Sequence, residues 1–134
     1  MSELKSQKEI LHIEELAKQK PWIGVDYDGT MVTHPSFVDP NDHGGKVVPK
    51  MRDRVVRWCM QGRRVKIMTA RAANTNPNRE QDIAPIRQHL KDNYPEVCHN
   101  LEITAEKDYG MIELWDDRAI GIIRDTGERA DGEV

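Results

Sequence analysis

Short apolar segments alternate with longer amphipathic segments along this chain, and the alternation restricts the possible folds more than any other feature of the sequence. The apolar segments have the lengths of buried strands and cover residues 22–26, 64–69, 101–104, 112–115 and 120–123. Helical patterns are expected at residues 3–19, at residues 49–61, and between a polar loop at 72–78 and Asn93. Strands that alternate with helices are typical of a parallel sheet with helices on both faces, so we predict an α/β fold.

The length and composition indicate one domain in a reducing compartment. A chain of 134 residues is the size of a single domain, in which residues 1–20 would form an N-terminal helix and residues 124–134 a frayed polar tail. The longest apolar runs, such as residues 119–123, are far shorter than the roughly 18 residues of a membrane span. The two cysteines, Cys59 and Cys98, provide neither a disulfide framework nor a CxxC pair. We therefore expect a cytoplasmic protein without a membrane partner.

Polar and charged side chains gather where the predicted strands end. Asp26 and Asp28 are two positions apart at the end of the first strand, so both side chains point the same way before Gly29 turns the chain. Thr69 ends the second strand, and Asp116 follows a later one. The carboxyl ends of parallel strands share one edge of the sheet, which is where ligands bind in open α/β folds. The sequence therefore predicts a polar site at this edge.

Carboxylates that converge on one edge repel one another unless a cation lies among them. A ligand set made of oxygen alone, without histidine or thiol, suits Mg²⁺ together with a substrate phosphate. The Thr69 hydroxyl and the Lys107 ammonium would supply partners for the remaining phosphate oxygens. These residue types favour phosphoryl transfer, in which an aspartate is an eligible nucleophile.

The motif Asp26-x-Asp28-Gly29-Thr30 is followed in the chain by Thr69, then by Lys107 and then by the pair Asp116-Asp117. This order resembles the haloacid dehalogenase (HAD) superfamily, and the resemblance spans residues 26–117. The spacing from Lys107 to Asp116, and Arg118-Ala119 after the acidic pair, resemble small members of the superfamily. The resemblance implies a Rossmann-like, HAD-like fold and a Mg²⁺-dependent phosphomonoester hydrolase that acts through an aspartyl-phosphate.

The resemblance also implies roles for the four aspartates. Asp26 would be the nucleophile and a ligand of Mg²⁺. Asp28 would be the general acid and base, with its backbone carbonyl on the metal. Asp116 would bind the metal directly or through water, and Asp117 would complete the acidic cluster.

The phosphate would be held by residues from several loops. The resemblance implies that Thr69 donates a hydrogen bond to the phosphoryl group and that Lys107 neutralises its charge and steadies Asp26. The backbone N–H groups around Asp28, Gly29 and Ala70 are expected as further donors, with Thr30 and Arg71 also at the phosphate site.

The chain has no room for the cap domain of larger HAD phosphatases, since only residues 31–48 and 72–100 are available. We therefore expect an open site that is covered either by a partner subunit in a homo-oligomer or by a large substrate. Residues 54–79 contain seven basic residues and no acidic one, which is either a solvated face or a surface for an anionic substrate. We hypothesise the second, with a nucleotide or a nucleic-acid end as substrate and Arg71 on its second anionic group.

One function of a different class stays open. The chain could be a phosphate- or metal-binding regulatory module that keeps the HAD scaffold but has little turnover. The acid/base residue Asp28 is intact, which favours the enzyme. The five histidines show no ligand spacing and are interpreted as surface or loop residues: His12, His34, His43, His89 and His99.

Overall fold

The computed structural model describes residue 7 and residues 20–133. Strands and helices alternate from residue 22 to residue 104, as the sequence predicts, and one more strand follows. Their bounds are β1 (Trp22–Asp26), α2 (Pro49–Met60), β2 (Arg64–Met68), α3 (Arg79–Asn93), β3 (Leu101–Thr104) and β4 (Met111–Trp115). The helix predicted at residues 3–19 lies outside the described residues, apart from residue 7.

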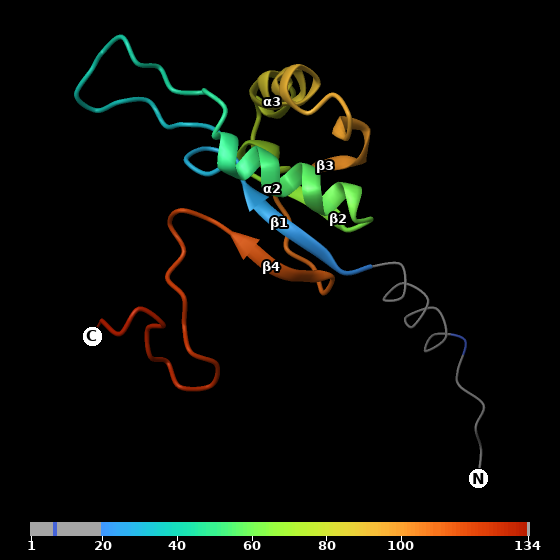
Figure 1. The fold of residues 1–134 in the computed structure, drawn as a ribbon, viewed down its shortest axis with the longest axis vertical. Coiled ribbons are helices and arrows are strands. Elements are labelled where there is room, and N and C mark those ends of the chain that lie inside the picture. Colours follow the sequence, from blue (N-terminus) through green and yellow to red (C-terminus); the bar gives the residue numbers. More distant parts are fainter. Residues whose placement is uncertain (1–6, 8–19, 134) are drawn as a thin grey trace.

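The four strands form one sheet in the order β3-β2-β1-β4, and every pair is parallel (Figure 1). The predicted parallel α/β architecture is therefore confirmed. In this register Asp26 lies beside Met68 of β2, and Val25 lies beside Trp115 of β4. The residues that follow β2 and β4 are thus delivered to the same edge of the sheet as Asp26.

The two described α helices pack on the same face of the sheet. Val25 of β1, Val55 of α2 and Ile86 of α3 belong to one buried cluster, and α2 and α3 lie on one side of the strands in Figure 1. The steps from β1 to β2 and from β2 to β3 run in the same direction, and right-handed crossovers in one direction leave their helices on one face. The expectation of helices on both faces therefore does not hold for the described helices.

The connection from β3 to β4 contains no helix. Residues 105–110 instead pass the opposite face of the sheet, where Asp108 accepts a hydrogen bond from Trp22 Nε1 at 2.7 Å and lies 3.5 Å from Lys66 Nζ. Trp22 and Lys66 occupy strand positions that point away from the helices. A six-residue link is too short for a crossover helix, which is why this face receives a loop.

The strand predicted at residues 120–123 does not form, and this prediction is wrong. Ile122 makes an isolated bridge with Arg129, and the side chains of Ile120, Ile122 and Ile123 are about half exposed. The Ile123 N–H donates to the Glu128 carbonyl, so the backbone is satisfied by a local turn rather than by the edge of β4. Within the described residues, no helix has both the length and the apolar character needed to cross a bilayer.

Candidate functional site

The loop after β1 turns tightly and directs alternate side chains to opposite sides. The backbone N–H groups of Met31 and Val32 both donate to the Tyr27 carbonyl, which closes the turn. Tyr27 is buried on the core side, whereas Asp26 and Asp28 line a common cavity on the other. This confirms the predicted orientation of the two aspartates.

Gly29 is needed in this turn for two separate reasons. Its φ of +88° lies in the left-handed region that other residues rarely adopt. A Cβ atom at this position would also lie 2.6 Å from Asp117 Oδ2 and 2.6 Å from His34 Cδ2. Gly29 therefore allows the loop after β1 and the loop after β4 to approach each other closely.

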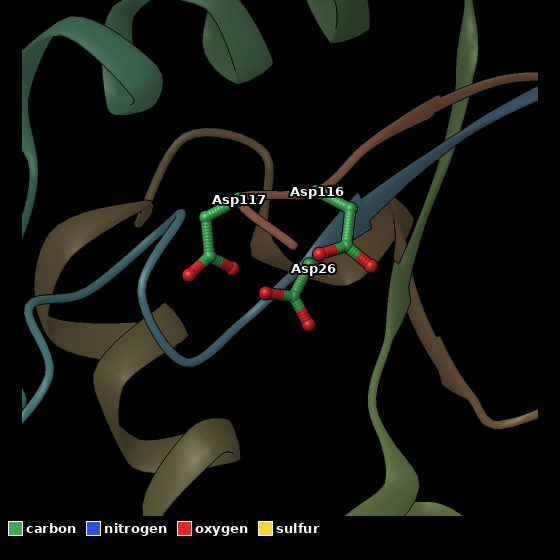
Figure 2. Close-up of side chains that lie close together, drawn as sticks. All are labelled: Asp26, Asp116 and Asp117. Carbon is green, nitrogen blue, oxygen red and sulfur yellow. The ribbon is translucent and has the colours of Figure 1, made fainter. Parts of the chain in front are cut away.

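Three carboxylates converge beyond the ends of β1 and β4, as Figure 2 shows. Each of Asp26, Asp116 and Asp117 offers one oxygen, and these oxygens all lie within 4.8 Å of one another. The Thr30 hydroxyl lies 3.2 Å from Asp26 Oδ2 and 3.4 Å from Asp117 Oδ1, and it accepts the Asp117 backbone N–H at 3.2 Å. Thr30 thus connects the two loops at the centre of the cluster.

The crowding changes the protonation of the cluster. Burial, a hydrogen bond with Asp117 and the negative charge of Asp116 raise the pKa of Asp26 to about 7, although Thr30 acts in the opposite direction. Burial also raises the pKa of Asp117, but its hydrogen bonds with Asp26 and Thr30 and the charge of His34 outweigh burial and hold that pKa below its usual value. Below about pH 7 Asp26 therefore keeps a proton that an ordinary aspartate would have released, while Asp117 stays ionised beside it.

A cavity of about 270 Å³ lies beside this cluster. It brings together most of the side chains that the sequence predicted for the site. Its lining residues are Asp26, Asp28, His34, Thr69, Ala70, Arg71, Asp116 and Arg118. Thr69 is buried, and its hydroxyl accepts the Arg71 backbone N–H at 3.2 Å, which fixes the turn at Ala70–Ala72.

Arg71 forms two hydrogen bonds with the Asp28 carboxylate, one from Nε and one from Nη2. The Nη2 atom lies 2.6 Å from Asp28 Oδ1, and Nε lies 3.1 Å from Oδ2. The guanidinium group also donates to the Asp82 carbonyl at 3.3 Å and lies over the Tyr27 ring at 5.6 Å. Both Asp28 oxygens are thus occupied by Arg71, a pairing that the sequence did not predict.

Three predicted phosphate-site residues do not line the cavity. One is Gly29, whose backbone N–H donates to the Val32 carbonyl at 2.8 Å and so is not free for a phosphate. Lys107 is exposed in the loop after β3 and is not among the residues that line the cavity. Thr30 lies between carboxylates and is also outside the cavity lining. The positive charge that borders the cavity instead comes from Arg71 and Arg118.

His34 is a site residue that the sequence interpretation missed. Its Nε2 atom lies 3.9 Å from Asp117 Oδ2, and its ring lines the cavity. The spacing of histidines along the sequence could not identify His34 as a site residue. Its place beside Asp117 depends on the path of the loop from β1 to α2, which returns to the acidic cluster. Arg118 had a signal in the sequence, since it directly follows the acidic pair.

The basic residues of segment 54–79 are largely neutralised. Five of the seven form ion pairs: Arg63 with Glu113, Arg64 with Glu102, Lys66 with Asp108, Arg71 with Asp28, and Arg79 with Glu80. Arg54 lies over the Trp115 ring at 5.1 Å. The segment therefore does not present a continuous cationic surface.

Comparison of the chain with models of protein families, with curated proteins and with solved structures finds no match in any of the three.

Proposed function

We propose that this chain is a Mg²⁺-dependent phosphomonoester hydrolase of the HAD type, with Asp26 as the nucleophile. The observation that carries the proposal is the convergence of Asp26, Asp116 and Asp117 beside a cavity that Thr69 and Arg71 also line. The carboxylates offer a metal site, and the hydroxyl and guanidinium groups offer partners for phosphate oxygens. The resemblance of the sequence motifs to the HAD superfamily supports the same reaction.

The donor set of the acidic cluster fits Mg²⁺. Three carboxylates without thiol or closely bound histidine form an oxygen-rich site for a hard divalent cation. The raised pKa of Asp26 is consistent with a cluster that lacks a compensating charge of its own. Asp26, Asp116 and Asp117 would hold the ion, which would offset negative charge on the carboxylates and on the transferred phosphoryl group.

The chain's own residues account for both half-reactions. In the first, a carboxylate oxygen of Asp26 forms a bond to phosphorus as the bond to the leaving oxygen breaks, and Asp28 gives that oxygen a proton. In the second, Asp28 takes a proton from water, whose oxygen attacks phosphorus and regenerates the Asp26 carboxylate. Thr69 and the backbone N–H of Ala70 would donate hydrogen bonds to the phosphoryl oxygens.

The test is release of inorganic phosphate from a panel of phosphomonoesters, with and without Mg²⁺. We expect release that requires Mg²⁺, that stops with chelator, and that Ca²⁺ does not restore because its looser coordination misplaces the nucleophile. Asp26→Asn should fold but lose turnover by orders of magnitude, because an amide is a poor nucleophile toward phosphorus. Full activity after exhaustive chelation, or near-normal activity of a folded Asp26→Asn protein, would contradict the proposal.

A second candidate function is a regulatory module that binds phosphate or metal with little turnover. The bidentate hold of Arg71 on Asp28 favours this candidate, because both oxygens of the acid/base are occupied. Calorimetric binding of Mg²⁺ and phosphate, with no phosphate release across the whole panel, would support the module over the enzyme.

A further inference from the structure

A second cavity, of about 460 Å³, lies next to the first. It lies between the loop that follows β1 and helix α3. Its lining residues are Tyr27, Asp28, Val32, Thr33, Pro35, His43, Gly45, Arg71, Pro85, Gln88, His89 and Asp92. The two cavities have only Asp28 and Arg71 in common, so this ion pair forms the boundary between them.

We infer that the second cavity binds the leaving-group alcohol of the substrate; this inference rests on the proposed phosphatase function. A general acid must lie between the phosphoryl group and the oxygen that departs with the alcohol. Asp28 is at that boundary, with Asp26 and Thr69 on one side and helix α3 on the other. A substrate phosphate that pairs with Arg71 would also release the Asp28 carboxylate for proton transfer, since one guanidinium group cannot hold both anions with its full set of donors.

The charges of the second cavity identify the class of alcohol. Leaving the histidines aside, Arg71 is the one basic residue in its described lining, and Arg71 is already paired with Asp28. The other charged lining residue is the carboxylate of Asp92. A further phosphate group on the alcohol would meet this carboxylate without an unpaired cation, which disfavours bisphosphates, nucleotides with several phosphates and nucleic-acid ends.

Hydrogen-bonding groups line the cavity beside apolar ones. Gln88 Nε2 donates to Asp92 Oδ1 at 2.9 Å, which leaves the Gln88 amide oxygen as an acceptor. The Thr33 hydroxyl accepts the Lys46 backbone N–H at 3.2 Å and keeps its own proton to donate. Tyr27 and Val32 offer apolar surface. The buried Nε2 atom of His89 has no hydrogen-bond partner within the described part of the chain. Burial lowers the pKa of His89, so its ring favours the neutral form. These features suit an uncharged alcohol with several hydroxyl groups, such as a polyol or a sugar.

This substrate class differs from the polyanion that the basic segment 54–79 suggested. Sequence composition counts positive charges, but the structure pairs most of them with carboxylates. The ion pairs of Arg63, Arg64 and Lys66 lie along the sheet and outside both cavities. The second cavity therefore determines the preferred substrate, and the basic segment does not.

The test compares the variants Gln88→Arg and Gln81→Arg. Both glutamines are exposed on α3, two turns apart, but Gln88 lines the second cavity and Gln81 lines neither cavity. The substrates are acetyl phosphate, which has a small leaving group, a hexose 6-phosphate and the corresponding hexose bisphosphate. We expect the wild type to prefer the hexose monophosphate over the bisphosphate.

Gln88→Arg should lower kcat/KM for the hexose monophosphate about tenfold and raise it for the bisphosphate, with acetyl phosphate unchanged. Gln81→Arg should match the wild type on all three substrates. Equal kinetics of Gln88→Arg and the wild type, or a wild-type preference for the bisphosphate or for oligonucleotide phosphates, would overturn the inference. No phosphate release from any substrate would instead overturn the proposed function.

A binding measurement tests the leaving-group cavity and the phosphate site separately and does not require turnover. We expect a hexose 6-phosphate, titrated into ¹⁵N-labelled Asp26→Asn protein, to shift the backbone amide signals of Thr33, Gln88 and His89 as well as those of Ala70 and Arg71. Shifts confined to Ala70 and Arg71 would overturn the leaving-group assignment while leaving the phosphate site intact. Shifts at neither group would contradict both.

Discussion

At the scale of single residues, Asp28 is well placed for proton transfer, but its carboxylate is not free to carry it out. It lies where a general acid is needed, beside both cavities, but Arg71 holds both of its oxygens. A carboxylate that is fixed by a bidentate arginine is well oriented, and it becomes free only when another anion competes for the arginine. Asp28 can therefore act as the general acid only when the substrate phosphate competes with it for Arg71.

Asp28→Asn should reduce turnover of alkyl phosphates by about 10²–10⁴-fold and affect aryl phosphates much less. Aryl leaving oxygens depart without much protonation, whereas alkyl oxygens require it. Steady-state kinetics on a pair of alkyl and aryl esters would measure the difference, with thermal melting to confirm that loss of the Arg71 ion pair leaves the variant folded. Equal losses on both esters would remove Asp28 from the acid role.

Gly29→Ala should destabilise the protein more than Gly62→Ala. Both glycines have positive φ, +88° and +80°, so each substitution costs about 1–2 kcal/mol of left-handed strain. At Gly62 a Cβ atom meets nothing within 4 Å, whereas at Gly29 it meets Asp117 and His34. The crowding should add about 1–3 kcal/mol, measured as the difference in free energy of unfolding between the two variants in urea. Equal losses would show that the two loops can separate without cost.

At the scale of elements, the site depends on the approach of two loops rather than on either strand alone. The end of β1 supplies Asp26, the loop after it supplies Thr30, and the loop after β4 supplies Asp116 and Asp117. The sheet brings the strand ends together, but the final contact between the loops goes through the Thr30 hydroxyl. Thr30 is therefore better described as a residue that joins the loops than as a phosphate ligand.

Thr30→Val should lower the free energy of unfolding by about 1 kcal/mol and weaken Mg²⁺ binding, because it removes the hydroxyl and keeps the shape. Thr30→Ser keeps the hydroxyl and should retain Mg²⁺ binding. Urea denaturation and calorimetric titration would measure the two effects. A Thr30→Val protein that binds Mg²⁺ as tightly as the wild type would show that the loops hold their positions without this contact.

At the scale of the whole molecule, the acidic cluster makes stability depend on pH. The pKa of Asp26 rises from 3.8 to about 7 on folding, mainly through burial, so between about pH 4 and pH 7 the folded protein keeps a proton that the unfolded chain has released. The stabilisation from this proton is complete below about pH 4 and is lost as the pH rises through about 7. Burial of His89 acts in the opposite direction, because its lowered pKa favours folding as the pH rises toward its ordinary value.

The contribution of Asp26 is therefore measured as the difference in free energy of unfolding between the wild type and Asp26→Asn. Without Mg²⁺, the stability of the wild type relative to Asp26→Asn should fall as the pH rises from 4 to 7 and become constant above that range. Urea denaturation of both proteins at several pH values gives this difference and cancels the effect of His89. A difference that is constant from pH 4 to 8 would show that Asp26 titrates normally in the folded protein.

The sequence by itself determined the order and type of the elements from β1 to β4, because strand lengths, Pro49 and Gly62 act locally. It also placed Asp26, Thr69 and Asp116 at one edge, since parallel strands share the direction of their ends. The sequence failed to predict the structure of residues 120–123. These apolar residues are typical of a strand, but their backbone forms hydrogen bonds within a local turn instead of joining the sheet.

Only the tertiary structure decided the features that depend on distant residues. The order β3-β2-β1-β4 placed α2 and α3 on one face, and the loop from β1 to α2 returned His34 to the acidic cluster. The fold also paired Arg71 with Asp28 and left Lys107 exposed, although the family resemblance implied Lys107 at the phosphate and Arg71 was expected on an anionic group of the substrate. The physical reason is that local sequence fixes backbone preferences, whereas an ion pair requires two side chains to meet across the fold, and the packing of the sheet and its loops determines which ones do.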